Sequence, residues 1–312
     1  MSERATARDP ALKLPPMSAS RASPGDPASL HIVPRADMRI GTILVAHKAM
    51  ESEDIDRVIK MQDAKGLRFG EAAVRLGLIT VSDLRRALAQ QYDLPHLLPE
   101  NERSDGELVV ASDPFNRCAE QVRAVRTQLM IRWSTERPGC RTLAIVSPER
   151  QDGRSYAAAN LAVAFAQLGS RTLLVDADLR RPRQHRIFSV PDSVGLSTVL
   201  SQRAGREAVV PIREFGHLAL LPAGAPPPNP AELLSGEAFH NLVSELKEDY
   251  DVILFDTPSA STCSDAQTVA FRAGSAMMLA RKDHTRLADA TRLVRQLDHA
   301  GAQLLGTVCN AF

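Results

Sequence analysis

A strand, a short polar loop and a helix follow one another in the middle of the chain, and this succession most restricts the possible fold. We predict an apolar strand over 142–147 and a helix over 155–168. A loop at this place in nucleotide-binding α/β proteins wraps phosphate groups with backbone N–H donors. Its usual Gly-Lys-Ser/Thr ending is replaced here by Gly153-Arg154-Ser155. We therefore expect a phosphate loop in which an arginine stands in for the lysine.

From residue 114 onward, apolar strands alternate with amphipathic helices. The predicted strands are 142–147, 172–177, 218–222, 251–256, 275–281 and 304–309, and the predicted helices are 115–133, 155–168, 230–248, 264–272 and 285–300. Strands that are buried on both faces and alternate with helices favour a mostly parallel, doubly wound sheet. The expected fold class is therefore an α/β fold of the P-loop NTPase type, and a small helical domain precedes it.

The N-terminal third has a different composition and contains a repeat. Residues 1–37 are rich in Pro, Ser, Ala and Arg and predict a disordered tail. Residues 38–98 form a tandem repeat, and a polar linker over 99–113 then leads into a domain over 114–312. Landmarks of the repeat recur 29 residues apart, at Arg39/Arg68, Gly41/Gly70, Val45/Val74, Ile55/Leu84 and Gln62/Gln91. Each copy predicts a short helix, a turn and a second helix, and Thr80 with Asp83 predicts a capping box.

Carboxylates follow two of the predicted strands. Asp176 and Asp178 end the second strand and point to the same side of it, and Asp256 follows four apolar residues in the Walker-B form. Asp176 suits the acceptance of a proton from an attacking hydroxyl, whereas Asp178 and Asp256 suit Mg²⁺, directly or through water. The alternative is that each aspartate merely caps the turn that follows its strand. Three such motifs in the right order favour nucleotide chemistry.

Composition excludes several classes of function. The formal net charge of +1 argues against a global field that would attract nucleic acid or a membrane surface. The four cysteines lack metal-ligand spacing and are expected as reduced thiols: Cys118, Cys140, Cys263 and Cys309. No apolar run approaches the ~18 residues of a membrane span, and no signal peptide is evident. We expect a cytoplasmic protein.

Several stretches of the α/β part together resemble the bacterial tyrosine kinases (BY-kinases) of exopolysaccharide biosynthesis, in particular the chain-length determinant group. They are 158–162, 176–182, 195–197, 221–224, 228–234 and 251–258. The resemblance implies ATP and Mg²⁺ as cofactors, with Asp176 as catalytic base. It also implies Ser155, Asp178 and Asp256 as metal-site residues. The nucleotide would contact Gly153, Arg154, Ser155, Tyr156, Asp178 and Arg180, with Arg154 replacing the catalytic lysine.

The same resemblance implies partners. Glu120, Arg123 and Arg126 match the family's oligomerisation motif, and their spacing places them on one helical face. On spacing alone, a solvated face with pairs inside the helix is the alternative. The family further implies a homo-oligomeric ring that a membrane chain-length determinant protein recruits to the inner membrane. Neither nucleic acid nor a membrane span of the chain's own is expected.

Two departures from the family pattern affect the expected activity. The phosphate loop is degenerate, and no tyrosine cluster follows the last predicted strand. The tyrosines are Tyr92, Tyr156 and Tyr250, so we expect any tyrosine phosphorylation to act on another protein or an internal site. Partition-type ATPases are a competing match, but Glu149 stands where they carry a second lysine. The main rival reading is a pseudokinase scaffold without catalysis.

The N-terminal repeat resembles the small N-terminal domain of type II secretion and type IV pilus ATPases. Members that bind cyclic di-GMP carry two 24-residue motifs five residues apart, and 39–62 and 68–91 reproduce these lengths. The implied ligand residues are Arg39, Ile40, Gly41, Gln62, Arg68, Phe69, Gly70 and Gln91. The glycines would let a ligand approach the backbone, and the guanidinium groups would bind guanine edges or phosphates. The alternative is a docking module that keeps the repeat for packing.

Overall fold

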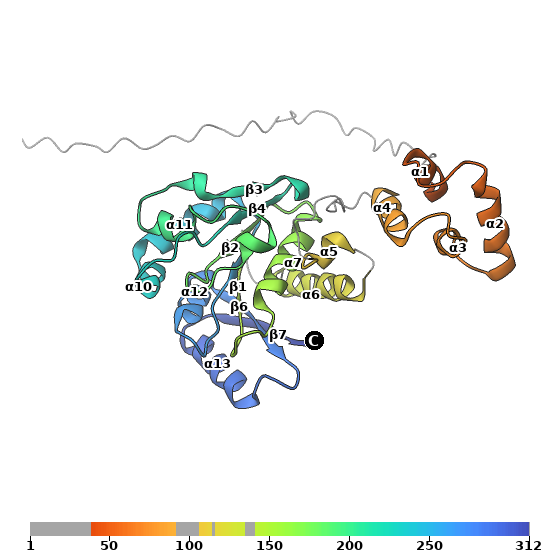
Figure 1. The fold of residues 1–312 in the computed structure, drawn as a ribbon. Helices are drawn as coiled ribbons and strands as arrows, with labels where there is room; N and C mark the ends of the chain where they lie inside the picture. Colours follow the sequence, from red (N-terminus) through yellow and green to blue (C-terminus); the bar gives the residue numbers. More distant parts are fainter. Residues whose placement is uncertain (1–38, 92–105, 114–115, 135–140, 312) are drawn as a thin grey trace, which may run out of the picture. The chain divides into compact units, whose positions relative to one another are not determined.

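The computed structural model describes residues 39–91, 106–113, 116–134 and 141–311 (Figure 1). The predicted tail over 1–37 lies outside the described residues, as does Tyr92. Within the described ranges, no helix combines the length and the apolar character that a membrane crossing needs.

Four short helices form the N-terminal repeat, as predicted. They are α1 (Ile40–Ala46), α2 (Asp54–Lys65), α3 (Phe69–Arg75) and α4 (Val81–Gln91). The helices enclose their own core, which contains Ile43, Leu44, Met50, Val58, Ala72, Ala73, Ile79 and Ala87. The predicted capping box precedes α4: the Asp83 N–H donates to Thr80 Oγ1 at 3.1 Å, and the Thr80 N–H donates to Asp83 Oδ2 at 3.0 Å. This exchange satisfies backbone donors that a helix start leaves open.

The two repeat glycines lie inside this small core. A Cβ at Gly70 would lie 2.3 Å from Leu84 Cδ1, and a Cβ at Gly41 would lie 3.2 Å from Phe69 Cζ. Neighbouring side chains therefore occupy the space above both glycines. The structure gives Gly41 and Gly70 a role in packing, which differs from the ligand approach that we expected of them.

The α/β domain contains a seven-stranded sheet in the order β3-β4-β2-β5-β1-β6-β7. The strands are β1 (Arg141–Val146), β2 (Thr172–Asp176), β3 (Val210–Ile212), β4 (Leu218–Leu221), β5 (Val252–Asp256), β6 (Ser275–Arg281) and β7 (Gln303–Asn310). All neighbouring strands are parallel except β3, which pairs antiparallel with β4. The predicted α/β fold class is confirmed.

Helices cover both faces of the sheet. They are α5 (Val109–Ser112), α6 (Arg117–Ser134), α7 (Arg154–Ala166), α8 (Gln184–Ile187), α9 (Leu196–Leu200), α10 (Pro230–Ser235), α11 (Glu237–Asp249), α12 (Asp265–Ala273) and α13 (Leu287–His299). Side chains alternate across each strand, so Leu143 and Leu254 pack toward α6 and α7, whereas Ala144 and Phe255 pack toward α11 and α12. Figure 1 shows α5, α6 and α7 together on one side of the sheet.

Three local features differ from the sequence predictions. The helix expected over 230–248 is divided at Gly236, whose extended backbone ends α10 and begins α11. The edge strand β3 was not predicted. The end of the expected linker belongs to the domain: the Asn160 side chain accepts from Val110 N at 3.1 Å and donates to Glu107 O at 2.7 Å. Burial of Leu108 and its neighbours against α7 explains why this segment is ordered.

Candidate nucleotide-binding site

The phosphate loop joins β1 to α7 and is held in shape by a buried aspartate. Asp152 Oδ2 accepts from Glu149 N at 3.0 Å, and Asp152 Oδ1 accepts from Thr285 Oγ1 at 2.9 Å. Gln151 adopts a left-handed conformation with φ of 62°, which a glycine would adopt with less strain. Gly153, also left-handed with φ of 98°, immediately precedes α7. The loop thus keeps a tight turn without the full set of glycines.

Arg154 turns its guanidinium toward the ends of β1 and β5. Its Nε donates to Thr257 O and its Nη1 to Glu149 O, each at 2.8 Å. A third, short hydrogen bond joins Nη1 to Ser147 Oγ. Burial raises the pKa of Asp178 and of Asp256, and the cation of Arg154 opposes both shifts. The positive charge of Arg154 therefore lies near the acidic residues. Some of its N–H donors are already hydrogen-bonded to oxygens of the protein.

The three predicted carboxylates converge beside this loop. Asp176 and Asp256 are register partners on the adjacent strands β2 and β5, and both are fully buried. Asp178 follows two residues after Asp176 and is only partly buried, and it faces the cavity described below. The aspartates at the strand ends thus form one acidic group, as the sequence motifs predicted.

Backbone N–H groups hold Asp176. Asp176 Oδ2 accepts from Arg183 N and Gln184 N, each at 2.9 Å, and Asp176 Oδ1 accepts from Asp178 N at 3.2 Å. Burial and the neighbouring Asp256 nevertheless raise the pKa of Asp176 well above its ordinary value, more than these donors lower it. A carboxylate with a raised pKa is a stronger base. The same hydrogen bonds stabilise the turn after β2. Asp176 therefore also caps this turn, which was the alternative role considered for it.

Burial also raises the pKa of Asp256, and hydrogen bonds from the Ser155 and Gln184 side chains oppose the shift. Gln184 Nε2 donates to Asp256 Oδ2 at 2.7 Å. The other oxygen, Asp256 Oδ1, is buried and has no hydrogen-bond partner among the described residues. Gln184 belongs to no motif that we identified, and only its place after the Asp176 loop could have drawn attention to it.

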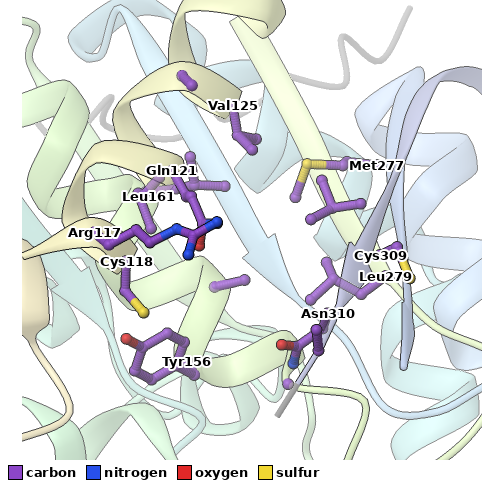
Figure 2. A pocket seen from close by; sticks show the side chains of 16 residues that line it. Arg117, Cys118, Gln121, Val125, Tyr156, Leu161, Met277, Leu279, Cys309 and Asn310 are labelled. Carbon is purple, nitrogen blue, oxygen red and sulfur yellow. The ribbon is translucent and has the colours of Figure 1, made fainter. Parts of the chain in front are cut away.

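Two cavities meet at the phosphate loop. The first, of about 600 Å³, is lined by loop residues, Asp178 and several arginines. The second, of about 610 Å³, lies between α6, α7, β6 and β7 and is mostly apolar. Figure 2 shows Val125, Met277 and Leu279 around it, with Tyr156 and Asn310 near one end. Cys118, Gly153 and Tyr156 line both cavities, so the two are neighbours.

The remaining predicted nucleotide contact has a partner inside the chain. Arg180 lines the first cavity, but its Nε donates to Asp265 Oδ2 at 2.8 Å. The Asp265 side chain is 1% exposed, so this ion pair anchors the turn after β2 to the start of α12. Arg180 therefore lines the cavity with a side chain that Asp265 holds in place.

The predicted oligomerisation residues also have partners within one chain. Arg123 Nη1 lies 2.5 Å from Glu120 Oε1, one helical turn away. Arg126 Nη1 donates to Ala164 O on α7 at 2.8 Å, and burial lowers the pKa of Arg126. Glu120 is exposed, whereas Arg126 is partly buried and contributes to the packing of α6 on α7.

The predicted cyclic di-GMP residues occupy equivalent places in the helical repeat. Arg39 and Arg68 are exposed and immediately precede α1 and α3, with the same extended backbone. Ile40 and Phe69 begin these helices and are partly buried, as are Gln62 and Gln91 near the ends of α2 and α4.

Comparisons with known proteins agree with this geometry. No protein-family profile matches the chain. The tyrosine-protein kinase YwqD of Bacillus subtilis is 34% identical over 208 residues, which cover 67% of this chain and 87% of YwqD. The putative tyrosine-protein kinase CapB of Staphylococcus aureus is 32% identical over 203 residues, 65% of this chain and 88% of CapB.

Solved structures show the same relationship. The crystal structure of the chimerical protein CapA2B2 matches with a TM-score of 0.62 and 32% identity, over 72% of this chain and 98% of that chain. The kinase domain of the Escherichia coli tyrosine kinase ETK matches with a TM-score of 0.62 and 27% identity, over 65% of this chain and 79% of that one. From its sequence, its sheet order and its acidic site, the chain belongs to the bacterial tyrosine kinases, the BY-kinase family.

Proposed function

We propose that the chain is a BY-kinase-type enzyme that uses ATP and Mg²⁺ to phosphorylate tyrosine on a partner protein, and that it regulates exopolysaccharide chain length or export. One observation carries this proposal. Asp176 and Asp256 are register partners at the ends of β2 and β5, beside the cation of Arg154. Two buried carboxylates beside a phosphate loop are costly for the fold and suit a divalent cation with phosphates.

The residues present fit Mg²⁺. Asp256 Oδ1 is a buried oxygen without a partner among the described residues, and Ser155 supplies a hydroxyl near the Asp256 side chain. Those residues include no cluster of three or more His, Cys, Asp or Glu side chains that would hold a metal unaided. Mg²⁺ commonly takes one or two carboxylates, water and substrate phosphates, so a sparse set is expected. When bound, the ion would neutralise charge on the transferred phosphoryl group.

The protein residues would divide the remaining work. Backbone N–H groups of the loop and Arg154 would bind the phosphates, and the Arg180–Asp265 pair would fix the opposite wall. Asp176 would accept the proton of the tyrosine hydroxyl, relayed through Asp178. Asp178 Oδ1 accepts a hydrogen bond from the backbone N–H of Arg181 in the turn after β2. The backbone N–H of Asp178 donates to Asp176 Oδ1. Because only Asp178 of the three acids lines the cavity, the Asp178→Asn variant should lose phosphoryl transfer as fully as Asp176→Asn.

The apolar cavity would take the base of the nucleotide. It adjoins the phosphate-side cavity at Cys118, Gly153 and Tyr156, which line both. The Cys118→Trp variant should therefore weaken nucleotide binding at least tenfold, about 1.4 kcal/mol. Unchanged affinity in a titration of the folded variant would exclude this cavity as the base site.

A second candidate function is a pseudokinase scaffold that docks on a membrane chain-length determinant protein. The bonds of Arg154 to Ser147, Glu149 and Thr257 support it, because they hold the loop cation on protein oxygens. Cyclic di-GMP is the effector proposed for the helical repeat. The equivalent exposed positions of Arg39 and Arg68 support that ligand.

Transfer of labelled phosphate from ATP to a Glu/Tyr copolymer, with and without Mg²⁺, tests the enzymatic proposal. The proposal predicts Mg²⁺-dependent labelling that Asp176→Asn abolishes. Thermal unfolding separates the scaffold: ligand at 100 times Kd stabilises by about 2.7 kcal/mol, several degrees for a domain of this size. No shift with ATP or ADP, together with a shift with cyclic di-GMP, would favour the scaffold.

A further inference from the structure

Gln184 connects the three segments that build the acidic site. Its side-chain Nε2 donates to Asp256 Oδ2 at 2.7 Å and to Ser155 O at 3.0 Å. Its backbone N donates to Asp176 Oδ2 at 2.9 Å. The end of β5, the start of α7 and the end of β2 are therefore tied through one residue, which is fully buried.

The chemistry of this side chain is unusual for a position of pure packing. Both amide protons have acceptors, but Gln184 Oε1 is buried and has no partner among the described residues. Leaving such an acceptor unpaired costs about 1–3 kcal/mol, and an apolar side chain of similar size would avoid that cost. An amide at this position is therefore best explained by its hydrogen bond to the Asp256 carboxylate.

We propose that Gln184 is a positioning residue of the Mg²⁺–nucleotide site, an inference that rests on the proposed function. It holds Asp256 by one oxygen and leaves the other, the buried Oδ1, without a partner among the described residues and so available to a cation. Through Ser155 O it fixes the first turn of α7, which carries the hydroxyl expected to share that cation. Outer contacts of this kind orient the groups that ligate a metal.

The test uses Gln184→Met, which has a similar length without an amide donor. Binding of a fluorescent ADP analogue to the full chain is measured in EDTA and across a Mg²⁺ titration. The proposal predicts that the Mg²⁺ concentration for half-maximal effect rises about tenfold or more, as is typical when an outer contact of a metal site is lost. Affinity for the analogue in EDTA should change less than about twofold, because Gln184 does not line the phosphate-side cavity.

Asn160→Leu is the matched control. Asn160 is another fully buried amide of the same domain, and it bonds to Glu107, Val110 and Tyr156 rather than to the acids. We expect a comparable loss of thermal stability with the Mg²⁺ dependence of wild type. If Gln184→Met does not fold, Gln184→Leu serves in its place.

A wild-type Mg²⁺ titration in a folded Gln184 variant would overturn the positioning role. An equal loss of affinity with and without Mg²⁺ would also overturn it and indicate a structural role. Absence of nucleotide binding by wild type itself would instead overturn the proposed function, and the role of Gln184 with it.

Discussion

Arg154 donates from Nε to the backbone oxygen of Thr257 across 2.8 Å, so the cation of the phosphate loop is tied to the end of β5. The bond explains how an arginine can stand in a lysine position without disordering the loop. Its planar group has five N–H donors and bridges oxygens of two segments, a span that one compact ammonium covers less well. The same bond sets a cost on nucleotide binding, because phosphates must compete with those oxygens.

The Arg154→Lys variant is therefore expected to bind nucleotide more tightly. An ammonium would release at least one of the three oxygens and reach the phosphates as a point charge. We expect a gain of about tenfold in affinity, ~1.4 kcal/mol, in a calorimetric titration with ADP and Mg²⁺. Arg203→Lys, at an exposed arginine that lines neither cavity, is the control and should leave affinity unchanged. If neither wild type nor Arg154→Lys binds nucleotide, the loop geometry does not support the catalytic assignment.

The Asp256→Asn variant should be more stable than wild type at neutral pH. Burial raises the pKa of Asp256 in the folded protein, so ionisation above the unfolded pKa near 3.8 opposes folding. Asparagine removes that charge and places an amide where Oδ1 has no partner among the described residues.

The gain in melting temperature should be largest at pH 7 to 8 and shrink as the pH falls to about 3, below the unfolded pKa, where the carboxyl is protonated in both states. Asp251→Asn is a control of opposite sign. A hydrogen bond from Arg171 lowers the pKa of Asp251, so stability from this pair is present above pH 4 and lost in acid. A melting temperature of Asp256→Asn below that of wild type at pH 7.5 would contradict the account.

The site could be predicted from sequence where a motif and a strand end coincide. Asp176 and Asp256 were identified as carboxylates at strand ends, and they lie side by side because β2 and β5 are parallel neighbours. Gln184 could not be predicted, because its contacts depend on how the turn after β2 folds back toward β5. The hydrogen-bond partners of Arg154 could not be predicted either, since an arginine side chain can extend in several directions.

Most elements of the fold could also be predicted from the sequence. Hydrophobic periodicity located six strands and both helices of each repeat. It missed β3, whose three residues include a proline, and the division at Gly236. Burial of Leu108 and Val110 depends on the distant Asn160 side chain, so a polar linker was the natural reading of that segment. The packing role of Gly70 required knowledge of where Leu84 lies.

The contacts of α6 predict different effects for the members of the oligomerisation motif. Arg126→Met leaves the Ala164 carbonyl without its donor and should destabilise the domain by about 1–2 kcal/mol in denaturant unfolding. Glu120→Gln, at an exposed ion pair, should change the stability by less than about 0.5 kcal/mol. If the motif forms a subunit interface, sedimentation velocity should show fewer oligomers for Glu120→Gln. Unchanged oligomers would leave the motif with an intrachain role alone.

In the helical repeat, packing and ligand binding can be separated. Gly70→Ala forces Leu84 to move and should destabilise the repeat by roughly 1–3 kcal/mol, seen as faster hydrogen exchange in α3 and α4. The double variant Arg39→Ala, Arg68→Ala should keep the exchange pattern, because both side chains are exposed. It should also abolish cyclic di-GMP binding in a titration. Persistent binding would exclude these arginines as ligand residues.

Isothermal titration of Mg²⁺·ATP into wild type and into Asp256→Asn tests the central claim most directly. We expect saturable binding to one site per chain in wild type, and its loss or a drop of at least tenfold in Asp256→Asn, although that variant is the more stable protein at neutral pH. Equal affinity of the two proteins, or no binding to wild type, would contradict the claim that the paired aspartates and the phosphate loop form a nucleotide site.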